Sequence, residues 1–445
     1  SMTAQRTLLL CSCDNTQKIQ PDILQKAAAA DQVETVDQLC GSDMQAAASA
    51  LGGDNEVIFA CSQQSQLFER LAEEIEVATG NVAPFASIDI RDRAGWGSAN
   101  ANSKRQTAKQ AALLVASQLP PPMTPIKNIV SDGVCCIIGP TEHALKMAEL
   151  VKDELGVTCV FTDAGPITFP SAAYSIARGQ LESAKGALGC FELEFTELQT
   201  LNQSGRGTLG YGPAQAKAGS ECDVFIDVRG EAPAFPSHQK RNGYFWADPT
   251  KTGELERIAL IARERVGEFE KTVYFKLEES LCAHSRAKQE GCSRCLEVCP
   301  TEAIFSAGDH VQIDSNICAG CGSCAAVCPT SAVTMTETPF EGITQALKTM
   351  ASQYREIAND SPRILFHSQE IGYQSIALSA RFDEGLADDL IPLALEHIDR
   401  IGHAEIIAAL GTGYKEVLIL ADTPEDRDAV AAEVALAQAM LAGSQ

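Results

Sequence analysis

The 445-residue chain has little of what nucleic acids and anionic membrane surfaces require from a protein. Lys and Arg together number 35 against 59 Asp and Glu, which gives a formal net charge of −24, and aromatic residues make up only 6%. Because both kinds of partner are bound by clustered cations, neither is expected. The acidic surface has two explanations, solubility alone or steering toward a basic patch on a redox partner.

Long apolar runs are also missing. No stretch approaches the roughly 20 apolar residues that a membrane-spanning helix needs. The run at residues 8–10 is far too short for the core of a signal peptide. We therefore expect a cytoplasmic protein without a membrane span. The sequence also shows no Ser/His/Asp set, paired catalytic carboxylates or phosphate-binding loop, so no catalytic residue is assigned.

Cysteine, in contrast, is abundant, with 17 residues. In a reducing cytoplasm such numbers indicate metal ligation rather than disulfides. The clearest motif is Cys318-Ala-Gly-Cys321-Gly-Ser-Cys324-Ala-Ala-Val-Cys328-Pro329, which has the C-x2-C-x2-C-x3-C-P spacing of bacterial ferredoxins. A structural zinc site is the alternative, and the proline and a second copy of the motif argue against it.

The second copy lies upstream as Cys282-x9-Cys292-x2-Cys295-x3-Cys299-Pro300. Its first gap is nine residues instead of two, so residues 283–291 must form a loop. In two-cluster ferredoxins the fourth cysteine of each run binds the other cluster. The expected ligands are Cys282, Cys292, Cys295 and Cys328 for the first [4Fe–4S] cluster, and Cys318, Cys321, Cys324 and Cys299 for the second.

Both motifs continue alike, with Cys-Pro-Thr-Glu-Ala-Ile after the first and Cys-Pro-Thr-Ser-Ala-Val after the second. This internal repeat predicts a (βαβ)2 ferredoxin domain over residues 269–338. Its outer strands are expected at 273–276 and 333–336, and a hairpin at 304–313 should turn at Gly308-Asp309. The inserted loop carries His284, Arg286 and Lys288, and it is either a plain solvated loop or a cationic docking or tuning feature.

Residues 1–122 alternate short apolar runs with helical patterns, which predicts a parallel sheet with covering helices. The expected strands are 7–11, 35–39, 57–61 and 83–90, and the expected helices are 43–51, 64–78 and 104–119. Four cysteines stand at strand ends: Cys11, Cys13, Cys40 and Cys61. Because the carboxyl ends of parallel strands lie along one edge, these cysteines form a candidate third site. Buried structural thiols are the alternative.

Three of these segments, Leu-Leu-Cys11-Ser-Cys13, Cys40-Gly-Ser-Asp and Val57-Ile-Phe-Ala-Cys61-Ser, resemble the amino-terminal domain of the heterodisulfide reductase A subunit, as does Ile-Arg-Asp at 90–92 before Trp96. That family associates the domain with a non-standard [4Fe–4S] site. The resemblance implies Cys11, Cys13, Cys40 and Cys61 as ligands. The family often has a cysteine two residues before the tryptophan, where this chain has Ala94.

Residues 123–268 are expected to form a degenerate Rossmann-like domain, with strands at 133–139, 157–162 and 222–228 and a helix at 142–155. The reductase subunit holds a flavin at this position, but the glycine turn that flavin requires is missing after Gly139. A G-x-G-x-x-G string at Gly205, Gly207 and Gly210 follows no strand, so flavin is not expected. We assign the remaining cysteines to core packing: Cys135, Cys136, Cys159, Cys190 and Cys222.

Residues 339–445 are predicted to continue the α/β pattern. The expected elements are helices at 340–359, 387–398, 404–411 and 424–441, and strands at 363–367 and 416–421. Residues 401–420 resemble the delta subunit of methyl-viologen-reducing hydrogenase. That family uses cysteines in this domain and this chain has none here, so a docking or dimerisation module is expected, with a homo-oligomer as one outcome.

The whole chain is predicted to be a multi-domain α/β protein in which parallel-sheet, Rossmann-like domains flank a (βαβ)2 ferredoxin domain. Taken as a whole, and most clearly over residues 267–295, it resembles the multi-domain 4Fe–4S proteins found beside formate dehydrogenases. This implies relay of single electrons through two or three [4Fe–4S] clusters to or from a molybdenum or tungsten oxidoreductase. Two alternatives stay open: a flavin-containing oxidoreductase subunit, and an iron–sulfur scaffold or maturation factor for a partner enzyme.

Overall fold

The computed structural model describes residues 5–97, 103–167, 173–202, 209–236, 239, 241–284 and 291–443. The chain divides into two compact units. The terminal unit combines Ser1–Met123 with Cys321–Gln445, and the central unit is Thr124–Gly320. Two features of the sequence analysis lie outside the described residues: the glycines Gly205 and Gly207, and the loop cations Arg286 and Lys288.

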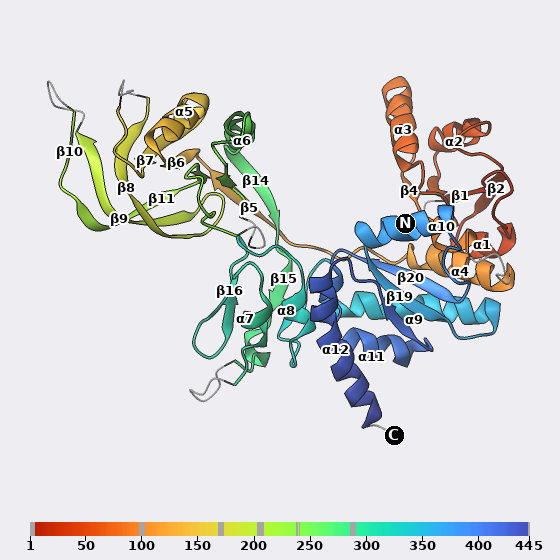
Figure 1. Cartoon of the computed structure of the whole chain (residues 1–445). Helices are drawn as coiled ribbons and strands as arrows, with labels where there is room; N and C mark the ends of the chain where they lie inside the picture. Colours follow the sequence, from red (N-terminus) through yellow and green to blue (C-terminus); the bar gives the residue numbers. More distant parts are fainter. Residues whose placement is uncertain are drawn as a thin grey trace. The chain divides into compact units, whose positions relative to one another are not determined.

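The first half of the terminal unit is built on a four-stranded parallel sheet of order β2-β1-β3-β4 (Figure 1). Its elements are β1 (Arg6–Cys11), α1 (Pro21–Ala27), β2 (Gln32–Val36), α2 (Met44–Leu51), β3 (Glu56–Phe59), α3 (Ser65–Thr79), β4 (Phe85–Ser87), the π-helical turn η1 (Arg91–Gly95) and α4 (Ser103–Ala116). The inner strands β1 and β3 are mostly apolar, and the leucines 8–10 of β1 are fully buried. The predicted parallel α/β arrangement is therefore present.

The second half of the terminal unit contains a three-stranded parallel sheet of order β20-β19-β21. Its elements are α8 (Ser323–Ala326), β18 (Val333–Met335), α9 (Phe340–Ala358), β19 (Arg363–Ser368), α10 (Ile371–Phe382), β20 (Leu390–Leu395), the 3-10 turn η5 (Ile398–Arg400), α11 (His403–Thr412), β21 (Val417–Ile419) and α12 (Pro424–Ala442).

These two halves share one hydrophobic core, although they are more than 200 residues apart in the sequence. The core joins Leu8 and Leu10 of β1 to Leu347 and Tyr354 of α9 and to Phe366 of β19. Helices α4 and α9 pack against each other. The two ends of the chain thus form one folded body, which the sequence patterns alone did not indicate.

The central unit contains an eight-stranded mixed sheet of order β10-β9-β8-β7-β6-β12-β13, with β11 also paired to β9. Its elements are β5 (Ile126–Ser131), β6 (Val134–Gly139), α5 (Thr141–Val151), β7 (Gly156–Phe161), β8 (Ser175–Lys185), β9 (Phe191–Asn202), β10 (Gly210–Tyr211), β11 (Gln215–Cys222), β12 (Val224–Asp227), β13 (Tyr244–Trp246) and α6 (Glu254–Arg263). The run from β8 to β13 is parallel, and the strands on the β9 side are antiparallel. The antiparallel extension was not predicted.

The central unit ends with β14 (Gly267–Thr272), which pairs with β5 as an antiparallel ribbon, and with the first cysteine motif. The remaining elements are β15 (Phe275–Leu277), the 3-10 turn η3 (Glu279–Leu281), α7 (Arg294–Val298), β16 (Ile304–Ser306) and β17 (Val311–Ile313). The predicted hairpin is confirmed, because β16 and β17 pair with Ile304 opposite Ile313. The boundary between the two units falls after Gly320, inside the second cysteine motif.

One predicted element has the wrong type, and another was not predicted. Residues 387–398 were expected to be helical, but they contain strand β20 and the short turn η5. Pro392 lies inside β20, and proline removes a helical hydrogen bond but is tolerated in an edge strand such as this one. Helix α10 was not predicted. The second strand was expected at 35–39 and runs instead over Gln32–Val36.

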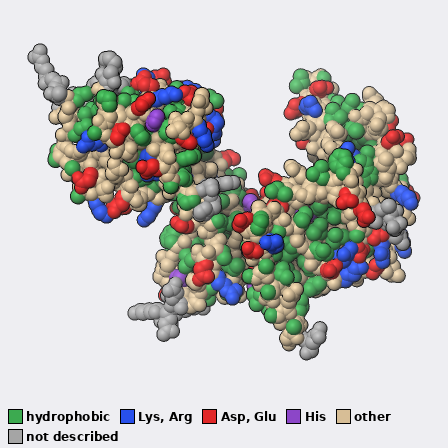
Figure 2. Space-filling view, in the orientation of Figure 1, with side chains coloured by type: hydrophobic (Ala, Val, Ile, Leu, Met, Phe, Trp, Pro, Cys, Tyr) green, Lys and Arg blue, Asp and Glu red, His purple; other side chains and the backbone are tan. Residues whose placement is uncertain are grey.

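No helix among the described residues is both long and apolar enough to cross a bilayer. On the face drawn in Figure 2, acidic and basic side chains are interspersed rather than gathered in one patch.

Candidate iron–sulfur sites

In the second cysteine motif, the position after Cys321 has space only for glycine. Gly322 has a φ of 90°, and a Cβ atom there would lie 2.6 Å from the Cβ atom of Arg400. This left-handed residue begins helix α8, which carries Cys324. The Sγ atom of Cys321 lies 3.6 Å from the hydroxyl of Ser323, so a hydroxyl accompanies this thiol.

Cys328 ends the same motif in an environment that favours its thiolate. Burial alone would raise its pKa, but backbone N–H groups of residues 330, 332 and 333, together with the Thr330 hydroxyl, lower the pKa below the ordinary value of 9.0. The Thr330 hydroxyl lies 3.8 Å from Sγ. Hydrogen bonds that stabilise a thiolate also stabilise a cluster sulfur ligand.

The first motif repeats this local geometry. The Thr301 hydroxyl lies 3.6 Å from Sγ of Cys299, as Thr330 lies near Cys328. The next residue in each copy, Glu302 and Ser331, is left-handed with a φ of 54°. The Cys-Pro-Thr repeat in the sequence is therefore also a repeat in structure.

The inserted part of the first motif is anchored by a buried histidine. His284 is only 2% exposed, and its ring contacts the Cys292 carbonyl at 2.8 Å and the Ser306 hydroxyl at 2.7 Å. The Gly291 N–H donates to the His284 carbonyl at 2.7 Å, which closes the base of the loop. Cys282 is buried just before it. From the sequence alone, this loop is either a solvated loop or a cationic docking or tuning feature. Neither describes His284, whose buried ring anchors the loop.

Cys11, at the carboxyl end of β1, interacts with the other amino-terminal cysteines. The Cys11 Sγ atom accepts from the backbone N–H groups of Cys13 at 3.3 Å and of Leu39 at 3.5 Å. Cys11 interacts electrostatically with Cys13 and Cys40, and Cys61 interacts with Cys11. Burial raises the pKa of Cys11 and raises that of Cys61 to about 11, so an apo site holds neutral thiols there.

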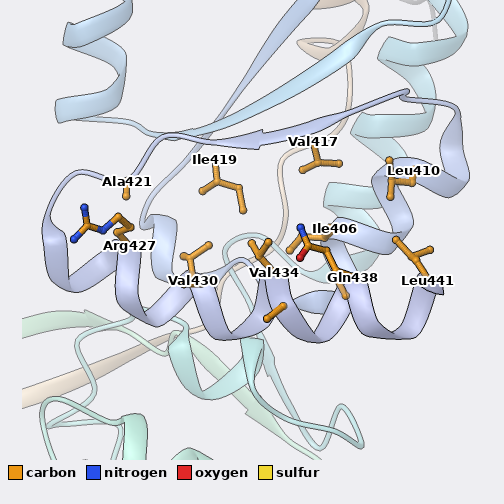
Figure 3. A pocket seen from close by; sticks show the side chains of 13 residues that line it. Ile406, Leu410, Val417, Ile419, Ala421, Arg427, Val430, Val434, Gln438 and Leu441 are labelled. Carbon is orange, nitrogen blue, oxygen red and sulfur yellow. The ribbon is translucent and has the colours of Figure 1, made fainter. Parts of the chain in front are cut away.

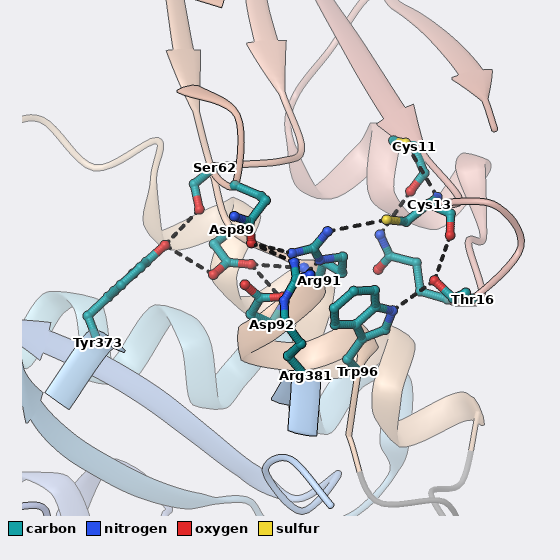
Figure 4. A network of polar contacts seen from close by, with 12 residues as sticks. Cys11, Cys13, Thr16, Ser62, Asp89, Arg91, Asp92, Trp96, Tyr373 and Arg381 are labelled. Carbon is teal, nitrogen blue, oxygen red and sulfur yellow. Dashed lines mark hydrogen bonds and ion pairs between the residues drawn. The ribbon is translucent and has the colours of Figure 1, made fainter. Parts of the chain in front are cut away.

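The guanidinium of Arg91 contacts one of these thiols directly (Figure 4). The Nη1 atom of Arg91 donates to Sγ of Cys13 at 3.2 Å, and its Nε donates to Asp92 at 2.8 Å. Its guanidinium also lies 3.9 Å from the ring centroid of Trp96. In the sequence, Arg91 stood out only as part of the Ile-Arg-Asp segment, and no sequence signal assigned it a role beside a thiol.

The turn that follows β1 is strained. Cys13, Asp14 and Asn15 all have left-handed backbones, with φ between 52° and 59°. Such conformations in residues other than glycine are costly and concentrate at functional sites. Side-chain hydrogen bonds hold this turn, because Ser12 accepts from the Asn15 N–H at 3.0 Å and Gln17 donates to the Cys11 carbonyl at 2.8 Å.

Of the five cysteines assigned to core packing, four are buried, and the assignment of Cys190 is wrong because this residue is exposed. Cys135 and Cys136 lie in different hydrophobic clusters because adjacent strand residues point to opposite faces. Burial raises the pKa values of both thiols well above 9.0. Cys159 and Cys222 are also buried, whereas Cys190 is exposed.

The terminal unit also contains an apolar pocket of about 470 Å³ formed by β21, α11 and α12 (Figure 3). Its lining is mainly aliphatic, with Arg427 and Gln438 as its polar side chains, and it includes no cysteine. It offers nothing to an iron–sulfur site.

Donor groups that suit iron–sulfur ligands lie beside several of the cysteines. Within the described part of the chain, no three His, Cys, Asp or Glu side chains converge as ligands of one metal ion. A [4Fe–4S] cluster instead takes cysteine thiolates and is tuned by N–H and O–H donors to sulfur. Those donors accompany Cys11, Cys299 and Cys328.

Comparison with known proteins bears on the central cysteine motifs. No curated protein gives a significant match to the chain. Residues 262–332 match the family model of a 4Fe–4S dicluster domain, and this range includes both cysteine motifs from Cys282 to Cys328. The chain therefore contains a ferredoxin-type 4Fe–4S domain, and an iron–sulfur electron-transfer role follows from it.

Proposed function

We propose that the chain is an electron-transfer subunit that relays single electrons through two or three [4Fe–4S] clusters to or from a partner oxidoreductase. The dicluster match over residues 262–332 carries this proposal. From the motif spacing, the ligands of the first cluster are Cys282, Cys292, Cys295 and Cys328. Those of the second are Cys318, Cys321, Cys324 and Cys299.

Each bound cluster supplies a centre that takes up and releases one electron. The residues of the chain would set how readily this happens. Hydroxyl groups of Thr301 and Thr330 lie beside the Cys299 and Cys328 sulfurs, and N–H groups also surround Cys328. The positive ends of these dipoles point at sulfur and would stabilise the negative charge that reduction adds. Cys282 and His284, at the start of the first motif, are both buried.

The amino-terminal site is proposed as a third cluster, with Cys11, Cys13, Cys40 and Cys61 as ligands. Three features support it: the electrostatic coupling among the thiols, the N–H donors to Cys11 and the guanidinium on Cys13. Ala94 stands where the family often has a cysteine, and the site here would be incomplete if that cysteine is a ligand.

The partner class follows from resemblance and charge. We propose a molybdenum or tungsten oxidoreductase of the formate dehydrogenase type as the donor or acceptor. A net charge of −24 would steer the chain toward a basic docking patch on this partner.

Iron, acid-labile sulfide and flavin, measured per chain on anaerobically purified protein, test the proposal. About twelve irons without flavin are expected, at four per cluster. About eight would remove the third site and keep the ferredoxin relay. Stoichiometric flavin would instead support an oxidoreductase subunit, and clusters that transfer to an apo-acceptor without redox competence would support a scaffold.

The ligand sets are tested separately. Cys299→Ser and Cys328→Ser should each remove about four irons per chain, whereas Cys61→Ser should remove the same number only from the amino-terminal site. Cys190→Ser is the matched control, because Cys190 is exposed and lies outside every motif. Unchanged iron in Cys299→Ser and Cys328→Ser would contradict the assignment.

A further inference from the structure

The ribbon formed by β5 and β14 contains an unfavourable pair of like charges. Lys127 and Lys271 are directly opposite each other in its antiparallel register. Like charges at directly opposed positions destabilise a pair of strands. Lys127 also contributes to lowering the pKa of Lys271, although burial is the larger cause. Two cations are thus held together at a cost to the ribbon.

The carboxylates of the same ribbon do not relieve this repulsion. Glu268 and Glu270 alternate with Lys271 along β14, so they project from the opposite face, and both are exposed. Charges are therefore sorted by face, with acidic side chains toward solvent and the lysines toward the chain segment that carries Cys318.

Both lysines donate into that segment. Lys271 Nζ donates to the Cys318 carbonyl at 3.1 Å, and Lys127 Nζ donates to the Ser315 hydroxyl at 2.9 Å. Lys271 is half-buried and interacts electrostatically with the Cys318 thiol. Partial burial reduces the screening of its charge by solvent.

A third cation approaches Cys299, another ligand of the same proposed cluster. Arg241 Nη2 donates to the carbonyl of Thr301 at 2.8 Å, two residues after Cys299, and the guanidinium interacts electrostatically with Cys299. Its guanidinium lies 4.9 Å from the Phe235 ring centroid. Burial lowers the pKa of Arg241, in keeping with a charge withdrawn from water.

Two carboxylates face these cations and offset part of their charge. Glu302 and Asp314 interact with Arg241, and Asp314 also interacts with Lys271. The Asp314 carboxylate accepts from the Asn316 N–H at 2.7 Å. Among the described residues in these interactions, three cations face two carboxylates.

We propose that Lys127, Lys271 and Arg241 raise the reduction potential of the cluster that binds Cys299 and Cys318, and so bias the electron of a singly reduced chain toward that cluster. Reduction adds one negative charge to the cluster, and nearby cations stabilise this charge more strongly where solvent screening is low. The inference rests on the proposed function, because it requires both ferredoxin clusters.

The test is a redox titration of the full-length, cluster-loaded chain, followed by electron paramagnetic resonance. In Lys271→Gln and Arg241→Gln, one of the two ferredoxin midpoints should become more negative. A tenfold change in the oxidised-to-reduced ratio, which is 59 mV for a one-electron couple, is expected from each change. The midpoint potential of the other ferredoxin cluster should not change. Lys271→Arg keeps the positive charge, so both midpoint potentials should stay at their wild-type values.

Lys217→Gln is the matched control. It removes one positive charge from an exposed ion pair with Glu182, in the eight-stranded sheet of the central unit. Lys127→Gln provides a second probe that leaves the Cys318 carbonyl contact in place, should Lys271→Gln lose iron. Midpoints that shift no further than in Lys217→Gln, or that both shift equally, would overturn the inference. A wild-type chain without clusters would instead overturn the proposed function.

Discussion

At the residue scale, Arg91 is the side chain that contacts a thiol of the proposed amino-terminal site. Its guanidinium joins Cys13, Asp92 and Gln63 through three hydrogen bonds. A thiolate at Cys13 would therefore have its counter-charge already in place.

Arg91→Gln should weaken the proposed amino-terminal cluster, because it removes the positive charge that contacts the Cys13 sulfur. We expect iron to fall from about twelve toward about eight per chain, with faster loss to a chelator, and Arg91→Lys should be intermediate. Iron per chain and chelation rate are the measurements. Arg381→Gln is the control, since Arg381 shares Trp96 and Gln63 but is not bonded to the thiol. Equal iron loss in both variants would contradict a specific role.

The buried amine of Lys109 leads to a second prediction, about the pH dependence of stability. It is fully buried, donates to the Ala387 carbonyl at 3.0 Å, and burial lowers its pKa to about 7. Arg93 and Arg363 disfavour its charge, whereas Asp388 and Asp389 favour it. Between pH 7 and the ordinary lysine pKa of 10.5, the unfolded chain binds the extra proton. Stability from this group should therefore rise with pH, by at most about 1.4 kcal/mol per unit.

The measurement is the free energy of unfolding against pH for the wild type and Lys109→Met. Subtracting the two curves cancels the other titrating groups that both proteins share. The difference should grow from pH 7 to pH 10 in the direction of wild-type gain. A flat difference would show that Lys109 is not charged differently in the folded and unfolded states.

At the element scale, sequence predicted elements with strong periodicity or fixed spacing and missed those that depend on neighbours. Strand β1, helix α9 and the β16–β17 hairpin were found within a residue or two, because their apolar spacing or turn residues are local signals. Strand β20 was predicted as a helix despite Pro392, whose ring and missing N–H favour an edge strand. Reading that proline correctly would have corrected the prediction.

The same distinction applies to the site. The cysteine spacing predicted candidate ligands without any structure, since thiolate positions are set by short local motifs. Arg91 and the Lys127–Lys271 pair could not be predicted, because their contacts join residues 78, 188 and 47 positions apart. Register between β5 and β14, which opposes the two lysines, is a tertiary property.

The loop between Cys318 and Cys321 makes an element-scale prediction. Gly320 has a φ of 82°, and a Cβ atom there would lie 2.7 Å from the Tyr274 ring. Gly320→Ala should therefore destabilise the loop by backbone strain and by collision with the ring, and it should lower iron occupancy. Gly308→Ala is the matched control, because Gly308 has a φ of 87° and a Cβ atom added there would meet nothing within 4 Å.

Unfolding free energy and iron per chain separate the two causes. Strain at a left-handed residue costs about 1–3 kcal/mol, which both variants share. Only Gly320→Ala should cost more than this and lose iron. Equal losses of stability with full iron in both variants would show that the Tyr274 contact adjusts without consequence.

At the scale of the whole molecule, the terminal unit is assembled from both ends of the chain. The central unit, Thr124–Gly320, is inserted between them in the sequence. Helix α9 provides much of the shared core through Leu347, Met350 and Tyr354, all at most 1% exposed. A destabilising substitution in α9 should therefore destabilise both the segments that carry the amino-terminal cysteines and the carboxyl-terminal sheet.

Leu347→Ala tests this coupling, since Leu347 is fully buried between the two halves. Removing a buried leucine side chain costs about 2–5 kcal/mol. Hydrogen exchange should therefore quicken in β1 and β19 together, and iron at the amino-terminal site should fall, while β6 in the central unit keeps its protection. Leu260→Ala, at an α6 position that is 58% exposed, should change neither. If β19 loses protection while β1 keeps it, the two halves fold independently, and the amino-terminal site does not depend on the carboxyl-terminal sheet for its stability.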